Sequence, residues 1–222
     1  MDSYRPAPSP GRADPWGVPT TTSASASIRE SVADDQAIVR AVLGGDRDAF
    51  RVLVERESAA VVRACHRVLG DLAEAEDVAQ EAFVIAYRSL ASWRSDGPFG
   101  AWISRIAVRL AIREAGRRRT VAWAQPRVGD EDATGLGPMA HLRAASAAEP
   151  EISALRGEQE RAIRAAVARL DEPYREVVAL RFFAERSLDE IAAVTGRPLG
   201  TVKTHLHRGL LRLRGTLSET AR

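Results

Sequence analysis

The stretch from Ser187 to Leu213, SLDEIAAVTGRPLGTVKTHLHRGLLRL, constrains this chain most, because it has the pattern of two short helices joined by a tight turn. Ser187 followed three residues later by Glu190 is typical of a capping box, which predicts that the first helix begins directly after Ser187. Gly196 suits the left-handed backbone of a sharp reversal, and Pro198 suits the first position of the second helix. The sequence therefore predicts a helix-turn-helix.

The second helix of this pair has two unlike faces. Apolar residues recur every three or four positions, which places them on one side: Val202, Leu206, Leu210 and Leu213. The other side is polar and basic, and it holds Thr201, Thr204, His205, Arg208 and Arg212, flanked by Lys203 and His207. A helix that is apolar inside and basic outside is typical of proteins that read the DNA major groove. An ordinary amphipathic helix with a solvated basic face is the alternative.

A longer segment, PYREVVALRFFAERSLDEIAAVTGRPLGTVKTHLHRGLLRLR, resembles the promoter-binding C-terminal domain of bacterial RNA polymerase sigma factors, most closely the small extracytoplasmic-function (ECF) group. The resemblance is carried by Pro173, Arg181, Glu190 to Ala192 and Gly200 to Lys203. It implies contact with the −35 promoter element through Arg181, Pro198, Gly200, Thr201, Lys203, Thr204, His207 and Arg208. Within that set, Arg181 and Lys203 are expected on backbone phosphates, and Thr201, Thr204, His207 and Arg208 nearest the bases.

The rest of the chain is expected to be helical as well. Apolar periodicity and capping signals predict four helices in the N-terminal half, over about 34–43, 46–69, 71–90 and 99–118, and further helices over about 151–170 and from 171 onward. Asp46 and Asp71 are the expected caps, and alternating β-branched runs are few. The predicted fold is all-α, with a four-helix N-terminal bundle and a C-terminal helix-turn-helix domain.

Two segments lack this periodicity. Residues 1–33 are rich in Pro, Ser, Thr and Ala and are expected to form a disordered tail. Residues 120–150 are poor in apolar side chains and rich in acids, so a flexible linker is expected there between domains at 34–119 and 151–217. The sigma-factor resemblance implies that this acidic linker threads into the polymerase toward the RNA path.

The third expected helix carries polar residues on one exposed side: Asp77, Gln80 and Glu81. Clustered carboxylates can indicate a metal site, but bundle sites of that kind use Glu-x-x-His pairs, and this segment has no histidine. A solvated acidic face is the plain alternative. The resemblance to sigma factors implies that these three residues dock on the clamp coiled coil of the polymerase largest subunit, where charge complementarity sets orientation and on-rate.

The fourth expected helix carries a basic stripe, Arg105, Arg109 and Arg113, beside a loop bracketed by Trp93 and Phe99. Guanidinium groups next to an aromatic-bearing loop suit single-stranded DNA, although the aromatic residues can also be plain core. The resemblance implies that Trp93, Arg94, Phe99, Arg105, Arg109 and Arg113 contact the −10 element. The family run has Asn where Arg109 stands and Asp where Arg113 stands, and both departures add positive charge.

Composition limits the other classes of function. The net charge is only +2, so clustering rather than the total indicates nucleic-acid binding. Cys65 is the single cysteine and is expected to fill a buried helix face, and the four histidines are not spaced as a metal site. No apolar run approaches the roughly 20 residues of a membrane span, and the N-terminal residues do not have the pattern expected of a hydrophobic signal segment.

These observations predict a cytoplasmic protein that is not an enzyme, has no cofactor and does not insert into a membrane. The expected partners are core RNA polymerase, through its clamp coiled coil and flap, then promoter DNA and an anti-sigma factor. The alternative is a stand-alone helix-turn-helix repressor or activator, which would bind a palindromic operator as a dimer and would not need the acidic patch.

Overall fold

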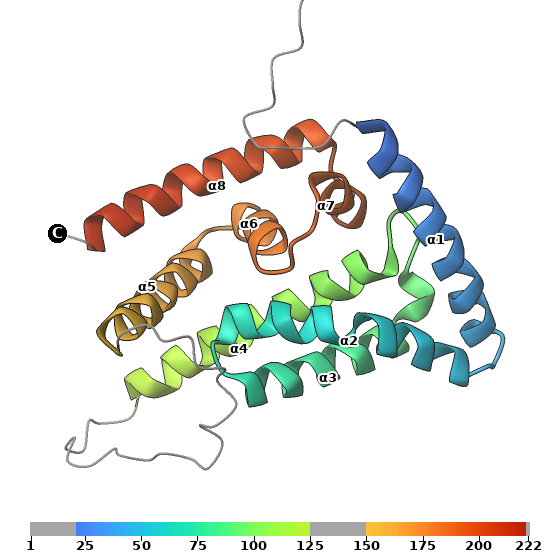
Figure 1. Ribbon diagram of the computed structural model, residues 1–222, viewed down its shortest axis with the longest axis horizontal. Coiled ribbons are helices and arrows are strands. Elements are labelled where there is room, and N and C mark those ends of the chain that lie inside the picture. Colours follow the sequence, from blue (N-terminus) through green and yellow to red (C-terminus); the bar gives the residue numbers. More distant parts are fainter. Residues whose placement is uncertain (1–20, 125–149, 221–222) are drawn as a thin grey trace, which may run out of the picture.

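The computed structural model describes residues 21–124 and 150–220, and within those ranges it contains helices and no strand (Figure 1). This confirms the predicted all-α class. None of the described helices is both long and apolar enough to cross a bilayer. The elements are α1 (Thr21–Leu43), α2 (Asp48–Leu69), α3 (Leu72–Arg88), the 3₁₀ turn η1 (Leu90–Ser92), α4 (Phe99–Ala124), α5 (Pro150–Arg169), α6 (Tyr174–Phe182), α7 (Leu188–Thr195) and α8 (Leu199–Thr220).

The N-terminal bundle consists of α1 to α4. Helices α2, α3 and α4 pack side by side, and α1 crosses one end of them (Figure 1). Leu53, Val61 and Ile103 are fully buried between the helices. Aromatic rings complete one end of this core, where Phe99 lies edge-on to both Phe50 and Trp93.

Local capping explains where these helices begin. The Asp71 side chain accepts a hydrogen bond from the backbone N–H of Glu74 at 3.0 Å and so caps α3. Glu74 itself pairs with Arg118 on α4, so its side chain ties two helices together. The Asp46 carboxylate accepts from the N–H groups of the next helix start, at 3.1 and 3.2 Å, which confirms the expected cap of α2.

The C-terminal bundle consists of α5 to α8 and contains the helix-turn-helix in α7 and α8. Ser187 and Glu190 form the reciprocal capping box, and Gly196 ends α7 with a φ of 67°. Both features confirm the prediction from the sequence. Helix α8 begins at Leu199, one residue later than predicted, and the Pro198 carbonyl accepts the first N–H groups of the helix. Pro198 is thus the residue before α8 and not its first member.

Helix α1 is longer than expected. It begins at Thr21, inside the segment 1–33 that was expected to lack structure; residues 1–20 lie outside the described part. Ile28, Val32, Asp35 and Val39 follow a helical spacing on the side that is at least partly buried. The two isolated apolar residues in a Ser/Ala-rich stretch were the signal for this extension, because alanine favours helix and their spacing continues the face of the shorter helix.

The boundaries near the expected linker also differ. Helix α4 continues to Ala124 instead of ending near Arg118, since no Gly or Pro interrupts it there. Helix α8 likewise runs to Thr220, past the expected fraying point. Most of the segment predicted to be a linker, residues 125–149, lies outside the described residues.

The two bundles lie in direct contact. Helix α4 of the N-terminal bundle packs against α6 and α7 of the C-terminal bundle, and α5 approaches the end of α2 (Figure 1). Side-chain hydrogen bonds join residues that are as many as 118 positions apart in the sequence. The sequence patterns predicted two modules and contained no signal for this contact.

Candidate nucleic-acid and protein interfaces

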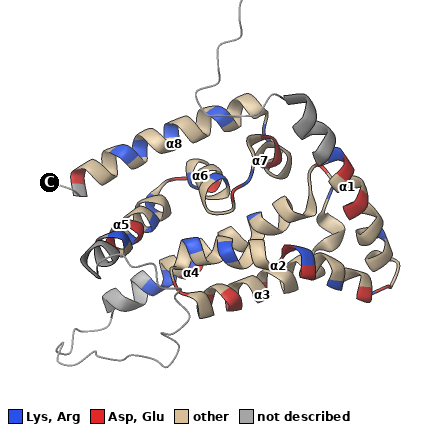
Figure 2. Ribbon diagram, in the orientation of Figure 1, with Lys and Arg blue, Asp and Glu red and all other residues tan. Residues whose placement is uncertain are grey.

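The outer face of α8 is open to solvent. Lys203, Thr204, His207 and Arg208 are all exposed, while Val202, Leu206 and Leu213 on the other side are buried against the bundle. The amphipathic pattern of the sequence therefore holds in three dimensions. Basic residues follow α8 along its length (Figure 2). A convex helix with hydroxyl, imidazole and guanidinium groups on its outer face can enter a DNA groove.

Two residues expected on that face, His205 and Arg212, contact Tyr174. The His205 ring packs edge-on against Tyr174 with centroids 5.6 Å apart, and the Arg212 guanidinium stacks over the same tyrosine at 4.2 Å. Arg212 also pairs with Asp171 at 3.1 Å. Burial lowers the pKa of His205, and the charges of Arg197 and Arg208 lower it further, so this imidazole is neutral at physiological pH. Fewer side chains of α8 are therefore available on its basic face than the sequence pattern indicated.

The other candidate −35 residues surround the start of α8. Pro198 and Gly200 are exposed, and Thr201 is half-buried. Arg181 stands apart on α6, where its guanidinium donates to the backbone carbonyl of Arg186 at 3.1 Å. That contact braces the turn between α6 and α7, so Arg181 positions the helix-turn-helix whatever else it contacts.

The acidic patch on α3 is formed as expected. Asp77, Gln80 and Glu81 are all exposed, while Val78 and Ala82 on the opposite side are buried. One oxygen of Glu81 lies 3.5 Å from the Arg113 guanidinium of α4, and both side chains are more than half exposed. A pair this exposed contributes little to stability and remains available to a partner.

The basic stripe on α4 is not free. Arg105 donates to Glu176 of α6 at 2.7 Å, and Arg109 lies 2.6 Å from the same carboxylate oxygen. Arg197, from the turn before α8, contacts the other Glu176 oxygen at 2.7 Å. Arg105 also donates to the backbone carbonyl of Val194. Two of the three arginines of the α4 stripe therefore bind the C-terminal bundle.

Glu176 is the centre of this cluster and was not singled out from the sequence. Its side chain is only 2% exposed, and burial by itself would raise its pKa. Hydrogen bonds from Arg197 and Arg105, together with the charges of Arg105 and Arg109, outweigh burial and hold the pKa of Glu176 below its ordinary value. The available signal was an acid placed directly before a buried apolar run, Val177 to Leu180.

The aromatic residues of the −10 set are core residues in this structure. Phe99 is fully buried and Trp93 is 8% exposed, so the alternative reading of them as core is the one the structure shows. The exposed residues of the loop are Arg94 and Asp96, which pair with each other at 2.8 Å. A hollow of about 370 Å³ lies beside the loop, between Trp93, Trp102 and the α7 residues Ala193 and Val194.

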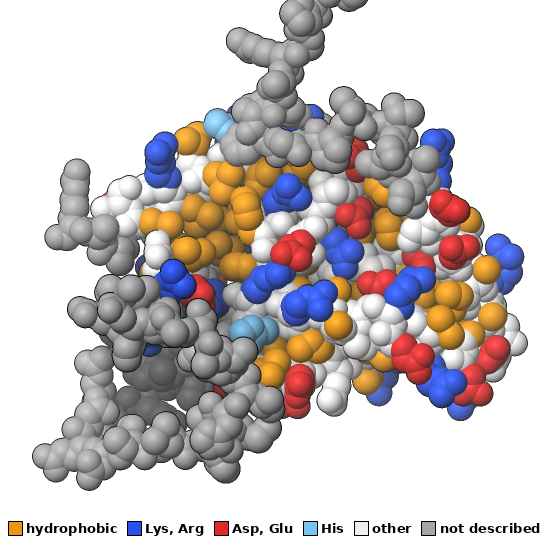
Figure 3. All heavy atoms as spheres, in the orientation of Figure 1, with side chains coloured by type: hydrophobic (Ala, Val, Ile, Leu, Met, Phe, Trp, Pro, Cys, Tyr) orange, Lys and Arg blue, Asp and Glu red, His pale blue; other side chains and the backbone are white. Residues whose placement is uncertain are grey.

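An apolar groove lies on the C-terminal bundle between α5, α6 and α8. It has a volume of about 620 Å³ and is lined by Ile163, Val167, Phe182, Phe183, Leu210 and Leu217, among others. Figure 3 shows these hydrophobic side chains gathered between α8 and α5. Phe182 is 50% exposed, because the neighbouring Phe183 takes the core position. Exposed apolar surface of this kind marks contact sites for other proteins.

The remaining candidates from the sequence are Cys65 and a metal site. Cys65 is fully buried, and burial raises the pKa of its thiol to about 12, which confirms its expected role as core filler. Among the residues that the structure describes, no three His, Cys, Asp or Glu side chains are grouped so that they could hold a metal ion.

Comparison with known proteins identifies both bundles. Residues 53–121 match the family model for sigma-70 region 2, and residues 160–213 match the model for sigma-70 region 4. The solved structure of CnrH in complex with the cytosolic domain of CnrY shares the fold, with a TM-score of 0.51 and 22% identity over 83% of this chain and 97% of that chain. The architecture is therefore that of a sigma-70-type factor.

Curated relatives extend the match over most of the chain. The ECF RNA polymerase sigma factor SigW of Bacillus subtilis is 33% identical over 181 residues, which are 82% of this chain and 95% of the relative. The RNA polymerase sigma-H factor of Pseudomonas aeruginosa is 35% identical over 177 residues, 78% of this chain and 89% of the relative. The chain belongs to the extracytoplasmic-function group of bacterial RNA polymerase sigma factors. It directs promoter recognition and transcription initiation by core RNA polymerase.

Proposed function

We propose that three surfaces of this sigma factor bind three different partners. The outer face of α8 reads the −35 element, the acidic patch of α3 holds the polymerase clamp, and the arginine stripe of α4 with its adjoining loop captures the −10 strand. The exposed outer face of α8 carries this assignment, because it presents Lys203, Thr204, His207 and Arg208 on one helix with no acidic residue among them.

On α8 the proposed roles follow from side-chain chemistry. Arg208 can form a bidentate pair with a guanine edge, and Thr204 and His207 can contact neighbouring bases. Lys203 neutralises a phosphate and contributes affinity without sequence preference. Pro198 and Gly200 present little side-chain bulk at the helix start, so the backbone there can approach the DNA closely.

On α3 the proposed partner is the clamp coiled coil of the polymerase largest subunit. Asp77 and Glu81 supply negative charge, and Gln80 between them supplies both a donor and an acceptor. A patch of this kind orients a basic helix and raises the association rate more than it raises the affinity.

The apolar groove between α5, α6 and α8 is the proposed site for the polymerase flap. Phe182 is the anchor of this surface, since half of its ring is open to solvent beside Leu210. Attachment to both the clamp and the flap would tether the −10 and −35 surfaces to one polymerase. Each weak contact with DNA would then act at a high effective concentration.

Control by an anti-sigma factor is proposed on the same grounds. CnrH, which shares this fold, was solved with the cytosolic domain of CnrY. The surfaces that hold polymerase are the ones such a partner would mask. We further infer that the protein works in the cytoplasm, where the polymerase acts, and that the sigma factor itself catalyses no reaction.

The clamp assignment is tested by charge reversal. The double variant Asp77→Arg with Glu81→Arg should no longer co-migrate with core enzyme on size exclusion, and run-off transcription should fall to background. The matched control is Glu30→Arg with Glu55→Arg, which changes the net charge equally at exposed positions of α1 and α2. Retained binding by the α3 variant, or equal loss in the control, refutes the assignment.

A further inference from the structure

We propose that Asp35 of α1 is a positioning residue for capture of the −10 strand. Its carboxylate holds the backbone at the start of α4 and thereby places the −10 loop, residues 93–98, which leads into that helix. The inference rests on the proposed function of this loop. Asp35 is fully buried, so it acts through Phe99 and does not touch DNA itself.

Asp35 is a carboxylate on the apolar side of α1. It lies four and seven positions before Val39 and Val42, so the three residues share one face of the helix, and all three are buried. A carboxylate in such a place costs free energy unless its oxygens have partners. The position therefore requires specific contacts from the neighbouring helices.

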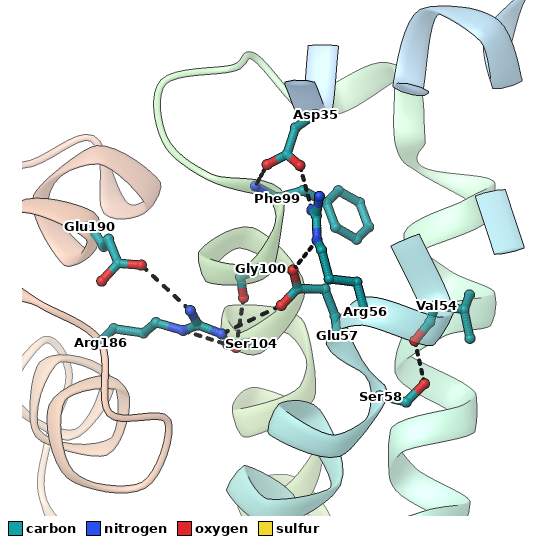
Figure 4. Close-up of polar contacts among 10 residues, drawn as sticks. All are labelled: Asp35, Val54, Arg56, Glu57, Ser58, Phe99, Gly100, Ser104, Arg186 and Glu190. Atoms are coloured by element: carbon teal, nitrogen blue, oxygen red, sulfur yellow. Dashed lines mark hydrogen bonds and ion pairs between the residues drawn. The ribbon is translucent and has the colours of Figure 1, made fainter. Parts of the chain in front are cut away.

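The two oxygens of Asp35 have different partners (Figure 4). Oδ2 accepts a hydrogen bond from the backbone N–H of Phe99 at 2.6 Å, and Oδ1 pairs with the guanidinium of Arg56 on α2. Phe99 is the first residue of α4. A single side chain thus joins α1, α2 and the start of α4.

The start of α4 lacks a capping side chain directly before it. First-turn N–H groups have no partner within their own helix, and Ser, Thr, Asp or Asn usually accepts from them at this position. The residue there is Pro98, whose side chain cannot accept a hydrogen bond. Asp35, which is 64 positions away in the sequence, supplies the acceptor instead. Its negative charge also complements the positive end of the helix dipole.

The −10 loop is held at both ends and exposed between them. At its first end the Trp93 N–H donates to the turn η1 at 3.0 Å, and at its second end Asp35 holds Phe99. Between these points Arg94 is exposed, and Ser95 has a left-handed φ of 59°. The hollow of about 370 Å³ lies beside this loop. Its shape therefore depends on where the start of α4 is held.

A second carboxylate supports the arrangement. Arg56 lies between Asp35 and Glu57, and its Nε donates to Glu57 at 2.8 Å (Figure 4). The Glu57 carboxylate packs so closely on Gly100, the second residue of α4, that a Cβ atom there would clash with it. Glu57 thus orients Arg56, and Arg56 in turn orients Asp35 toward the start of α4.

Loss of a buried carboxylate also destabilises a protein, so stability and base reading have to be measured separately. A misplaced loop lowers the preference for the correct −10 bases, whereas a less stable bundle lowers only the amount of active protein. The ratio of transcription from a cognate promoter to transcription from one with a −10 mismatch separates these effects. The amount of active protein cancels in that ratio.

The test uses holoenzyme reconstituted from the full chain and core polymerase. Run-off transcription from a library of duplexes with randomised promoter sequence, read by sequencing, first defines the −10 and −35 bases that the wild type selects. A mismatch at a base that is read lowers binding by roughly five- to 150-fold, and Asp35→Ala should reduce the −10 ratio by at least about threefold. The −35 ratio should stay unchanged.

The control for stability is Val61→Ala, which removes part of a fully buried side chain of α2. It should lower the midpoint of thermal unfolding and leave both promoter ratios unchanged. An unchanged −10 ratio in Asp35→Ala, or an equal reduction in Val61→Ala, overturns the proposal.

Asp35→Asn tests the contact with Phe99 directly. This variant keeps an acceptor for the Phe99 N–H and loses the charge that faces Arg56, so it should retain the −10 preference that Asp35→Ala loses. Arg56→Gln breaks the same ion pair from the other side and should retain the preference as well. Loss of the −10 preference in Asp35→Asn overturns the proposal, and this outcome decides the matter even where Asp35→Ala does not fold.

The double variant Arg94→Ala with Asp96→Ala separates this inference from the proposed function of the loop. If it keeps the −10 preference of the wild type, the assignment of the loop to the −10 strand fails. If it loses the preference while Asp35→Ala keeps it, the assignment of the loop stands and the role of Asp35 is refuted.

Discussion

Helices α4 and α8 carry similar arginine-rich faces and use them differently. On α8 the outward Lys203 and Arg208 are exposed to solvent. On α4 the corresponding Arg105 is 25% exposed and is bound to a carboxylate that is 2% exposed. Residue chemistry alone predicts nucleic-acid binding for both helices. The packing of one bundle on the other decides which of them is available.

Burial also changes the strength of the two sets of charges. Coulomb interactions strengthen as water is excluded, so the Glu176 cluster is more strongly held than any pair on the surface of α8. Exposed charges on α8 are screened by salt and exchange readily between water and phosphate. The α8 face is thus suited to a first encounter with DNA, whereas Arg105 and Arg109 of α4 are occupied by Glu176.

The largest expected effect on DNA binding concerns the exposed face of α8. Arg208→Ala should cost roughly 1–3 kcal/mol of binding free energy at a cognate −35 site and less on scrambled DNA, because the variant loses a base contact. Holoenzyme binding to the two duplexes, compared by anisotropy, measures the difference. Equal losses on both would remove base reading from Arg208 and weaken the contrast with α4.

The next effect compares two ion pairs. A double-mutant cycle of Arg105→Ala and Glu176→Ala should give a coupling energy of about 1–2 kcal/mol in urea unfolding, because the pair is largely buried. The matched cycle of Arg212→Ala on α8 and Asp171→Ala, between α5 and α6, should give about 0.5 kcal/mol or less, since these side chains are 49% and 82% exposed. Equal coupling energies would contradict the distinction between the buried ion pair on α4 and the exposed ion pair on α8.

A smaller effect is expected at Lys203. Replacement by alanine should weaken binding evenly on cognate and scrambled DNA, and the slope of log affinity against log salt should fall by about one, because one phosphate contact is lost. A salt titration of both duplexes measures it. An unchanged slope would place Lys203 away from the phosphates.

The smallest effect at neutral pH comes from protonation of Glu176. Its pKa lies below the ordinary value of 4.5, so its contribution to the contact between the two bundles is complete above that value and is lost as the pH falls through the lowered pKa. The charged groups facing it are Arg105 and Arg109 of α4 and Arg197 of its own bundle, and the Glu172 carboxylate accepts a hydrogen bond from the Glu176 backbone N–H.

Solution scattering should detect this transition as an increase in the radius of gyration under acid conditions. Glu176→Gln should show no comparable step at the lowered pKa, because it has no carboxylate to protonate there. A wild-type radius that stays constant down to global unfolding would contradict the role given to this carboxylate.

The amino-acid sequence by itself determined the local structure. The capping box at Ser187, the left-handed turn at Gly196 and the two faces of α8 depend on neighbours within a few positions, so their patterns could be recognised directly. The acidic patch of α3 followed in the same way, because Asp77, Gln80 and Glu81 share a helix face by spacing alone. The extension of α1 to Thr21 was harder to see, because only Ile28 and Val32 mark it.

Only the tertiary structure decided which of these residues meet. Glu176 and Arg105 are 71 positions apart, and no periodicity relates them. His205 and Arg212 pack on the ring of Tyr174, which lies on another helix. Phe99 belongs to the core because the rings of Phe50 and Trp93 pack against it. Helix faces are set by short-range geometry, whereas ion pairs between bundles depend on how the completed helices dock, which short-range patterns do not encode.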